Sequence, residues 1–146
     1  MRRRFRDAEA PQDLIAAEDG MGFDFVKGSI KFIRGKRYPS CNSVLVDGPM
    51  RAVIDAASDR DPLLRFKEQG AVDYLITSHA HEDHLTFNYL FPGSQFCAHA
   101  EDARYFEDMD ALIDCYGDMP EDDRKKWRHF LREECHYGPR KIDLFL

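Results

Sequence analysis

The sequence lacks an apolar run long enough to cross a lipid bilayer. It also lacks a readable export signal, because Asp7, Glu9 and Asp13 stand where the apolar core of such a signal would lie. We therefore expect a cytoplasmic chain that has no membrane partner. Residues 1–22 are predicted to form a polar lead-in segment, whose basic cluster at residues 2–6 is a solvated tail or, alternatively, an arm that binds phosphate.

Closely spaced cysteines are absent as well. The four cysteines are far apart in the chain and form no Cys-x-x-Cys pair: Cys41, Cys97, Cys115 and Cys135. This spacing argues against a structural zinc knuckle and against a disulfide framework. Reduced thiols, as in cytoplasmic proteins, are the expected state.

An excess of positive charge is the third absence. The chain carries 21 Lys and Arg against 27 Asp and Glu, a formal net charge of −6. Proteins that hold a nucleic-acid backbone usually present a basic face, so this balance argues against nucleic acid as the main partner. The hydrophobic fraction of 43% in 146 residues is enough to build a core. We expect one domain over residues 23–146.

One segment concentrates metal-binding side chains. His79, His81, Asp83 and His84 form the pattern His-x-His-x-Asp-His directly after the apolar run 72–77. Imidazole nitrogens and carboxylate oxygens are donors that Zn²⁺ accepts, and Fe or Mn is also possible with this set. Alternate side chains of an extended segment point the same way. His79 and His81 are therefore predicted to hold one ion, and Asp83 and His84 a second. The alternative is a polar loop whose histidines bond to backbone and solvent.

At these residues the sequence resembles the metallo-β-lactamase superfamily of metal-dependent hydrolases. The apolar runs 42–48, 52–56 and 94–99 resemble the strands that flank this signature in the family. The resemblance implies an α/β fold, the αββα sandwich. It also implies that Asp55 is a carboxylate that orients the metal-binding loop, and that Asp83 is both a ligand and a catalytic group that steers the proton of the attacking water.

The chain also departs from the family pattern. The later metal-binding histidines and the bridging aspartate of the family have no counterpart after His84, where only His99, His129 and His136 follow. We therefore expect the amino-terminal half of such a fold, apparently truncated at the C-terminus, with a helical extension after the metal-loop region.

Periodicity predicts the elements around the signature. Hairpins are expected over residues 23–33 and 43–55, and strands over 72–77 and 94–99. Asp61 and Pro62 predict the start of a helix that stops before Gly70. Apolar residues at helical spacing predict one helix from residue 100 to about 116, and a second opens with a capping box at Asp118–Glu121.

Two functions follow from these residues. In the first, the resemblance implies a hydrolase in which metal-bound hydroxide attacks an ester, thioester, lactone, amide or phosphodiester of a small-molecule substrate. In the second, the chain is a fragment or subunit without catalysis of its own, which needs a second half or a homo-oligomeric partner to bind metal. Glu82, between the ligands, is expected to face away from the metals as a solvated or capping carboxylate.

Overall fold

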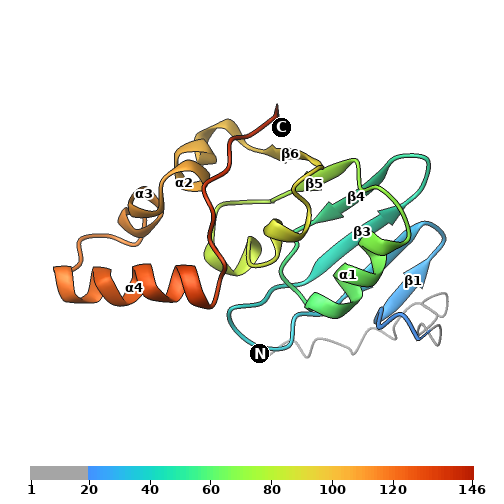
Figure 1. Ribbon diagram of the computed structural model, residues 1–146, viewed down its shortest axis with the longest axis horizontal. Helices are drawn as coiled ribbons and strands as arrows, with labels where there is room; N and C mark the ends of the chain where they lie inside the picture. Colours follow the sequence, from blue (N-terminus) through green and yellow to red (C-terminus); the bar gives the residue numbers. More distant parts are fainter. Residues whose placement is uncertain (1–19) are drawn as a thin grey trace, which may run out of the picture.

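A computed structural model describes residues 20–146 as a mixed α/β structure around one seven-stranded sheet (Figure 1). The strands follow one another in the sheet in chain order, from β1 to β7. Most of the predicted lead-in segment 1–22 lies outside the described residues. Within residues 20–146, no helix combines the length and the apolar character that a membrane span requires.

The first half of the sheet is antiparallel and matches the two predicted hairpins. It contains β1 (Phe25–Lys27), β2 (Ile30–Ile33), β3 (Ser43–Asp47) and β4 (Arg51–Ile54). Each of these strands pairs antiparallel with the next. The short connections at residues 28–29 and 48–50 make this antiparallel pairing the natural choice.

The second half of the sheet is parallel. Strands β5 (Tyr74–Ile76) and β6 (Gln95–Ala98) confirm the two predicted strands, and β7 (Leu144–Phe145) is an unpredicted edge strand. All three continue the sheet from β4 in parallel register. The carboxyl ends of β4, β5 and β6 therefore meet at one edge of the sheet, where open α/β sheets usually place their chemistry.

Helix α1 (Arg60–Glu68) connects β4 to β5. Its N-cap is Asp59, whose side chain accepts a hydrogen bond from the backbone of Asp61, so the predicted start at Asp61 is two residues late. Leu63 and Phe66 are fully buried against the sheet. At the other end, the Arg51 guanidinium donates to three carbonyl oxygens of residues 66–71 and closes the helix onto β4.

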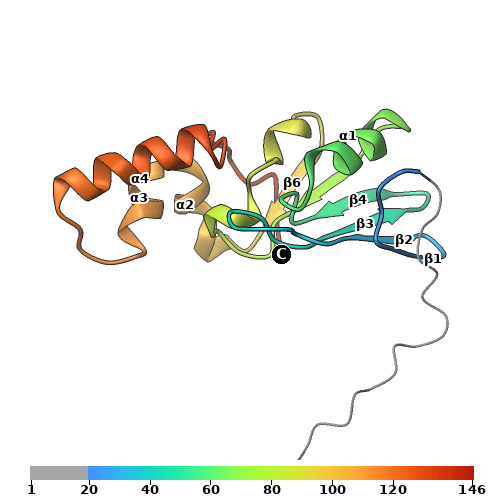
Figure 2. The ribbon, with the colours of Figure 1, turned by 90° about the horizontal axis from the view of Figure 1, so that it is seen from below.

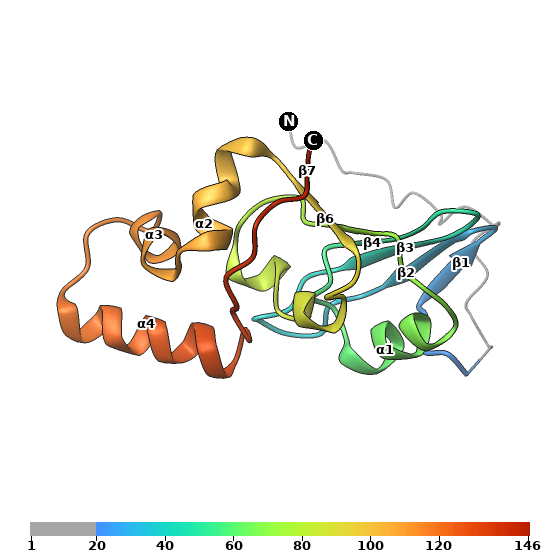
Figure 3. The ribbon, with the colours of Figure 1, turned by 45° about the horizontal axis from the view of Figure 1, so that its top comes forward.

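The helical extension follows β6. It comprises the 3₁₀ turn η3 (Ala100–Asp102), α2 (Ala103–Glu107), α3 (Met109–Asp114) and α4 (Glu121–Glu133), and lies at the end of the molecule away from β1 (Figures 1 and 3). The single helix predicted for residues 100–116 is wrong. Asp108 has an extended backbone, and its side chain accepts a hydrogen bond from the Asp110 backbone N–H. Asp108 is therefore the N-cap of a new helix, α3. The predicted capping box is also wrong, because the N-cap of α4 is Pro120, without a side-chain bond.

The two faces of the sheet differ. One face packs Leu45, Val53, Leu75 and Phe96 into the core below α1. The opposite face carries an in-register apolar row, which we call the open face: Phe25, Phe32, Val44, Ile54, Ile76, Cys97 and Leu144. Figure 2 shows α1 on one side of β1–β4 and none of the described helices on the other. Most of this row is half-buried, so the described part of the chain leaves apolar surface in contact with water.

Candidate metal centre

The signature lies on a loop that leaves β5 at the carboxyl edge of the sheet. We call residues 77–85 the metal loop; it includes the 3₁₀ turn η1 (Glu82–His84). Thr77 is fully buried and its backbone N–H donates to the Cys97 carbonyl at 3.0 Å, so the loop starts from a fixed point. Two backbone bonds within the loop, His81 to the His79 carbonyl and His84 to the His81 carbonyl, fold it into consecutive turns.

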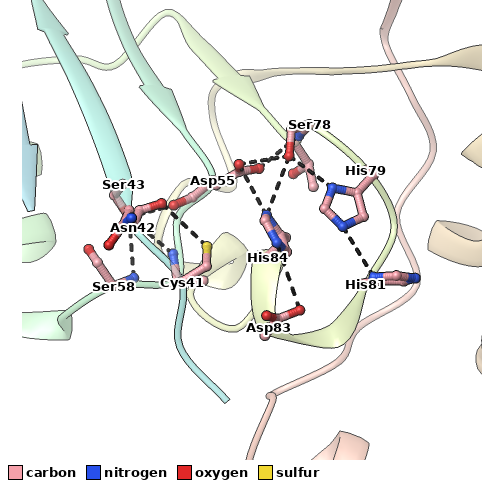
Figure 4. A network of polar contacts seen from close by, with 12 residues as sticks. Cys41, Asn42, Ser43, Asp55, Ser58, Ser78, His79, His81, Asp83 and His84 are labelled. Carbon is pink, nitrogen blue, oxygen red and sulfur yellow. Dashed lines mark hydrogen bonds and ion pairs between the residues drawn. The ribbon is translucent and has the colours of Figure 1, made fainter. Parts of the chain in front are cut away.

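His79 and His81 lie together, as the sequence predicts. His79 Nε2 is 3.1 Å from His81 Nδ1, and His79 Nδ1 is 3.1 Å from the Ser78 hydroxyl (Figure 4). Burial and the neighbouring rings of His84 and His81 lower the pKa of His79. A neutral imidazole is the form that binds a metal ion.

Asp83 and His84 form a second, looser pair. His84 Nε2 is 3.9 Å from the Asp83 carboxylate, and its other ring nitrogen, Nδ1, is 3.1 Å from Asp55 Oδ2. The hydrogen bond to Asp55 and the proximity of Cys41 raise the pKa of His84 to about 10. The rings of His79 and His84 are 4.0 Å apart, so the two pairs are neighbours.

Asp55 ties β4 to the metal loop. Its backbone N–H donates to the Ile76 carbonyl, and its two carboxylate oxygens accept from the Ser78 backbone at 2.7 Å and the Ser78 hydroxyl at 2.8 Å. Burial alone would raise the pKa of Asp55, but the bonds from His84 and Ser78 outweigh it and the pKa is lowered. Asp55 has φ of 52°, which is uncommon outside glycine and is held here by this set of bonds.

No three of the four signature side chains converge on one point. Within residues 20–146, one group of three offers ligand atoms that all lie within 4.8 Å of one another: Cys41, Asp55 and His84. No sequence signal marks Cys41 as a ligand, because it stands 43 positions before His84 in no recognisable spacing. Only the pairing of β3 with β4, and of β4 with β5, brings its segment to the metal loop.

Alternation along an extended loop predicts that Glu82 faces solvent, and this prediction is wrong. The 3₁₀ turn rotates it inward, where it is 5% exposed. Its two carboxylate oxygens accept hydrogen bonds from the hydroxyl groups of Tyr38 and Tyr116. Burial, and then the bond to Glu82, raises the pKa of both phenols, so they remain protonated donors. The rings of Tyr38 and Tyr116 stack on Phe130 and Trp127 of α4, which connects the metal loop to the helical extension.

The remaining histidines have other surroundings. His99 Nδ1 accepts a hydrogen bond from the Glu101 backbone at 3.3 Å and caps η3, which is a structural position. His136 lies against Tyr89 and lines a hollow of about 420 Å³ together with Asn88, Phe106 and other residues. No side chain of His79, His81 or His84 lines that hollow. A scan of protein-family models gives no match to this chain, and no curated protein matches it either.

Proposed function

We propose that the chain carries the metal-binding loop of a metal-dependent hydrolase with a metallo-β-lactamase-like αββα fold. One observation supports this most directly: the four signature side chains lie on a single loop at the carboxyl edge of a mixed sheet, and Ser78 and His84 of this loop bond to Asp55. A parallel strand that ends in metal ligands is a common way to present such a site.

The donor set fits a zinc centre. His79 and His81 are the proposed ligands of one ion, and Asp83 and His84 those of a second; iron or manganese is accepted by the same donors. His84 donates a hydrogen bond from Nδ1 to the Asp55 carboxylate. This leaves Nε2 as the ligand atom, on the side of Asp83. When bound, two such ions supply a hydroxide at neutral pH and polarise the bond that it attacks.

Asp83 also has a proposed catalytic role. Its side chain is 30% exposed, more than those of Asp55 and His84, so it is the most accessible of the three to a substrate. A carboxylate in this place accepts a proton from the attacking water at its free oxygen. The proposed substrate is a small molecule with an ester, thioester, lactone, amide or phosphodiester bond.

The open face supports the second candidate, a subunit that becomes active only with a further sheet. In an α/β fold, a sheet of this size normally has both faces buried. Where one face is exposed to solvent, that face is normally polar. Here the row from Phe25 to Leu144 is apolar, and the described residues leave most of it only half-buried. A second half, or a second copy of the chain, would bury this row and bring the remaining ligands.

Metal content tests the two candidates. The purified chain and two variants, His81→Ala and His129→Ala, are incubated with zinc, desalted and measured by mass spectrometry of the metal. His129 is the matched control because it is a histidine of α4, outside the metal loop. The hydrolase proposal expects less bound zinc in His81→Ala than in wild type and an unchanged amount in His129→Ala, together with hydrolysis of at least one substrate class. A zinc content that is unchanged in His81→Ala contradicts it. Absence of zinc from a self-associated wild-type chain favours the second candidate.

A further inference from the structure

Cys41, Asp55 and His84 come from three separate segments and meet beside the metal loop. Cys41 lies in the loop before β3, Asp55 follows β4, and His84 ends η1 (Figure 4). Their ligand atoms, a sulfur, a carboxylate oxygen and a ring nitrogen, all lie within 4.8 Å of one another. Asp55 is 9% exposed and Cys41 is half-buried, so the group is largely shielded from bulk water.

The spacing is that of ligands around one ion. Zinc–nitrogen and zinc–oxygen bonds of about 2.0–2.1 Å in a tetrahedron place the two ligand atoms roughly 3.3 Å apart. Asp55 Oδ2 and His84 Nδ1 are 3.1 Å apart. A cation that replaces the proton between these two atoms therefore needs little movement of either side chain. The longer zinc–sulfur bond, about 2.3 Å, requires a somewhat wider separation for Cys41, as the 4.8 Å limit permits.

Glycine fixes the approach of the Cys41 segment. A Cβ atom on Gly35 would lie 2.5 Å from the Cys41 carbonyl oxygen. Only glycine therefore allows the backbone at Gly35 and at Cys41, both in the loop between β2 and β3, to come so close. The Gly35 backbone N–H also donates to the Asn42 side chain at 3.1 Å. Cys41 is thus held on a constrained loop that faces the site.

We propose that Cys41 is a thiolate ligand of a soft divalent cation such as zinc, with Asp55 and His84 Nδ1 as the other protein donors. Binding releases the thiol proton and the Nδ1 proton and leaves the imidazole neutral with its hydrogen on Nε2. The inference rests on the proposed function for the metal-binding role of His84, and it moves the second ion: a neutral imidazole that binds at Nδ1 carries its hydrogen on Nε2, so Cys41 and Asp55 replace Asp83 as the partners of His84. A thiolate donor favours zinc or cobalt over manganese and magnesium, which prefer oxygen ligands.

Cobalt and alkylation measure the role of Cys41 in two independent ways. The full chain is titrated with Co²⁺, and the near-ultraviolet absorption of a cobalt–thiolate bond is recorded for wild type, Cys41→Ser and Cys115→Ser. Cys115 is the matched control because its thiol is exposed and lies outside the site. In the second measurement, wild-type chain reacts with iodoacetamide with and without saturating zinc, and the alkylation of each cysteine is followed by peptide mass spectrometry. This measurement requires no variant to fold.

The inference expects a thiolate band in wild type and Cys115→Ser that is absent in Cys41→Ser. It also expects zinc affinity at least about tenfold weaker in Cys41→Ser, since loss of even an outer partner of a ligand costs about 10–100-fold. Zinc should slow alkylation of Cys41 and leave that of Cys115 unchanged. Absence of the band, or equal alkylation of Cys41 with and without zinc, overturns the inference. If the zinc content still falls in His81→Ala, the proposed function stands without Cys41; if it does not fall, that function fails as well.

Discussion

Replacement of Tyr116 by phenylalanine tests whether the buried Glu82 carboxylate depends on its phenol donors. The change removes one hydroxyl group that donates to Glu82 and keeps the ring, which stacks on Trp127 at 5.0 Å. A hydrogen bond to a charged group contributes about 1.5–3 kcal/mol, and an ionised carboxylate at 5% exposure has little water to replace it. We therefore expect the free energy of unfolding to fall by about 1.5–3 kcal/mol.

Urea denaturation measures this change. Trp127 is the only tryptophan, so its fluorescence reports unfolding next to the substituted ring, and circular dichroism reports the whole chain. A chain of this length should lose roughly 2–4 °C of melting temperature per kcal/mol, about 3–12 °C here. Tyr89→Phe is the control: Tyr89 is 46% exposed and its hydroxyl only accepts a bond from Arg60 at the surface. We expect this control within about 0.5 kcal/mol of wild type.

A second substitution shows whether the two phenols act on one group. Tyr38→Phe removes the other donor to Glu82, so the double variant leaves the carboxylate without either phenol. We expect the double variant to lose more than the sum of the single losses, because one remaining donor still stabilises the charge. Equal denaturation midpoints for Tyr116→Phe and Tyr89→Phe would refute the reasoning.

Three further changes probe the fold. Gly35→Ala places a Cβ 2.5 Å from the Cys41 carbonyl oxygen and should destabilise the chain by more than about 1 kcal/mol in thermal unfolding, whereas Gly93→Ala meets no atom within 4 Å and should be nearly neutral. Arg51→Leu removes the donor to three carbonyl oxygens at the end of α1 and should cost at least about 2 kcal/mol in urea denaturation; an unchanged midpoint would show that water replaces it. Burial, and then nearby carboxylates, raises the pKa of Tyr137 above its ordinary value near 10, so its stabilisation is complete below pH 10 and falls as the pH rises further; Tyr137→Phe should lose stability less steeply above pH 10 than wild type.

The strands and the metal loop were predictable because their signals are local. Alternating or continuous apolar runs bounded by glycine and proline identify β1 to β6, and the signature directly follows β5. The edge strand β7 was not predicted, because two apolar residues near the end of a chain carry no periodicity. Its pairing with β6 depends on the return of residues 136–143 across the sheet.

Prediction from the sequence fails for residues whose positions depend on tertiary contacts. Glu82 was expected to face solvent from the alternation of an extended segment, but a 3₁₀ turn has three residues per turn and directs it inward. Asp108 looked like part of one long helix, since its role as a cap depends on where its side chain turns back. Cys41 has no local signal at all. It meets Asp55 and His84 only after three strands have paired.

Because Glu82 turns inward, neighbouring residues of one short loop contact two different parts of the molecule. His81 and Asp83 belong to the proposed metal centre. Glu82, between them, is connected to α4 through Tyr38 and Tyr116, whose rings stack on that helix. A substitution that moves Trp127 or Phe130 would thus shift the loop without changing any donor atom. Changes on the outer helices would therefore alter the geometry of the proposed metal centre while every proposed ligand stays the same.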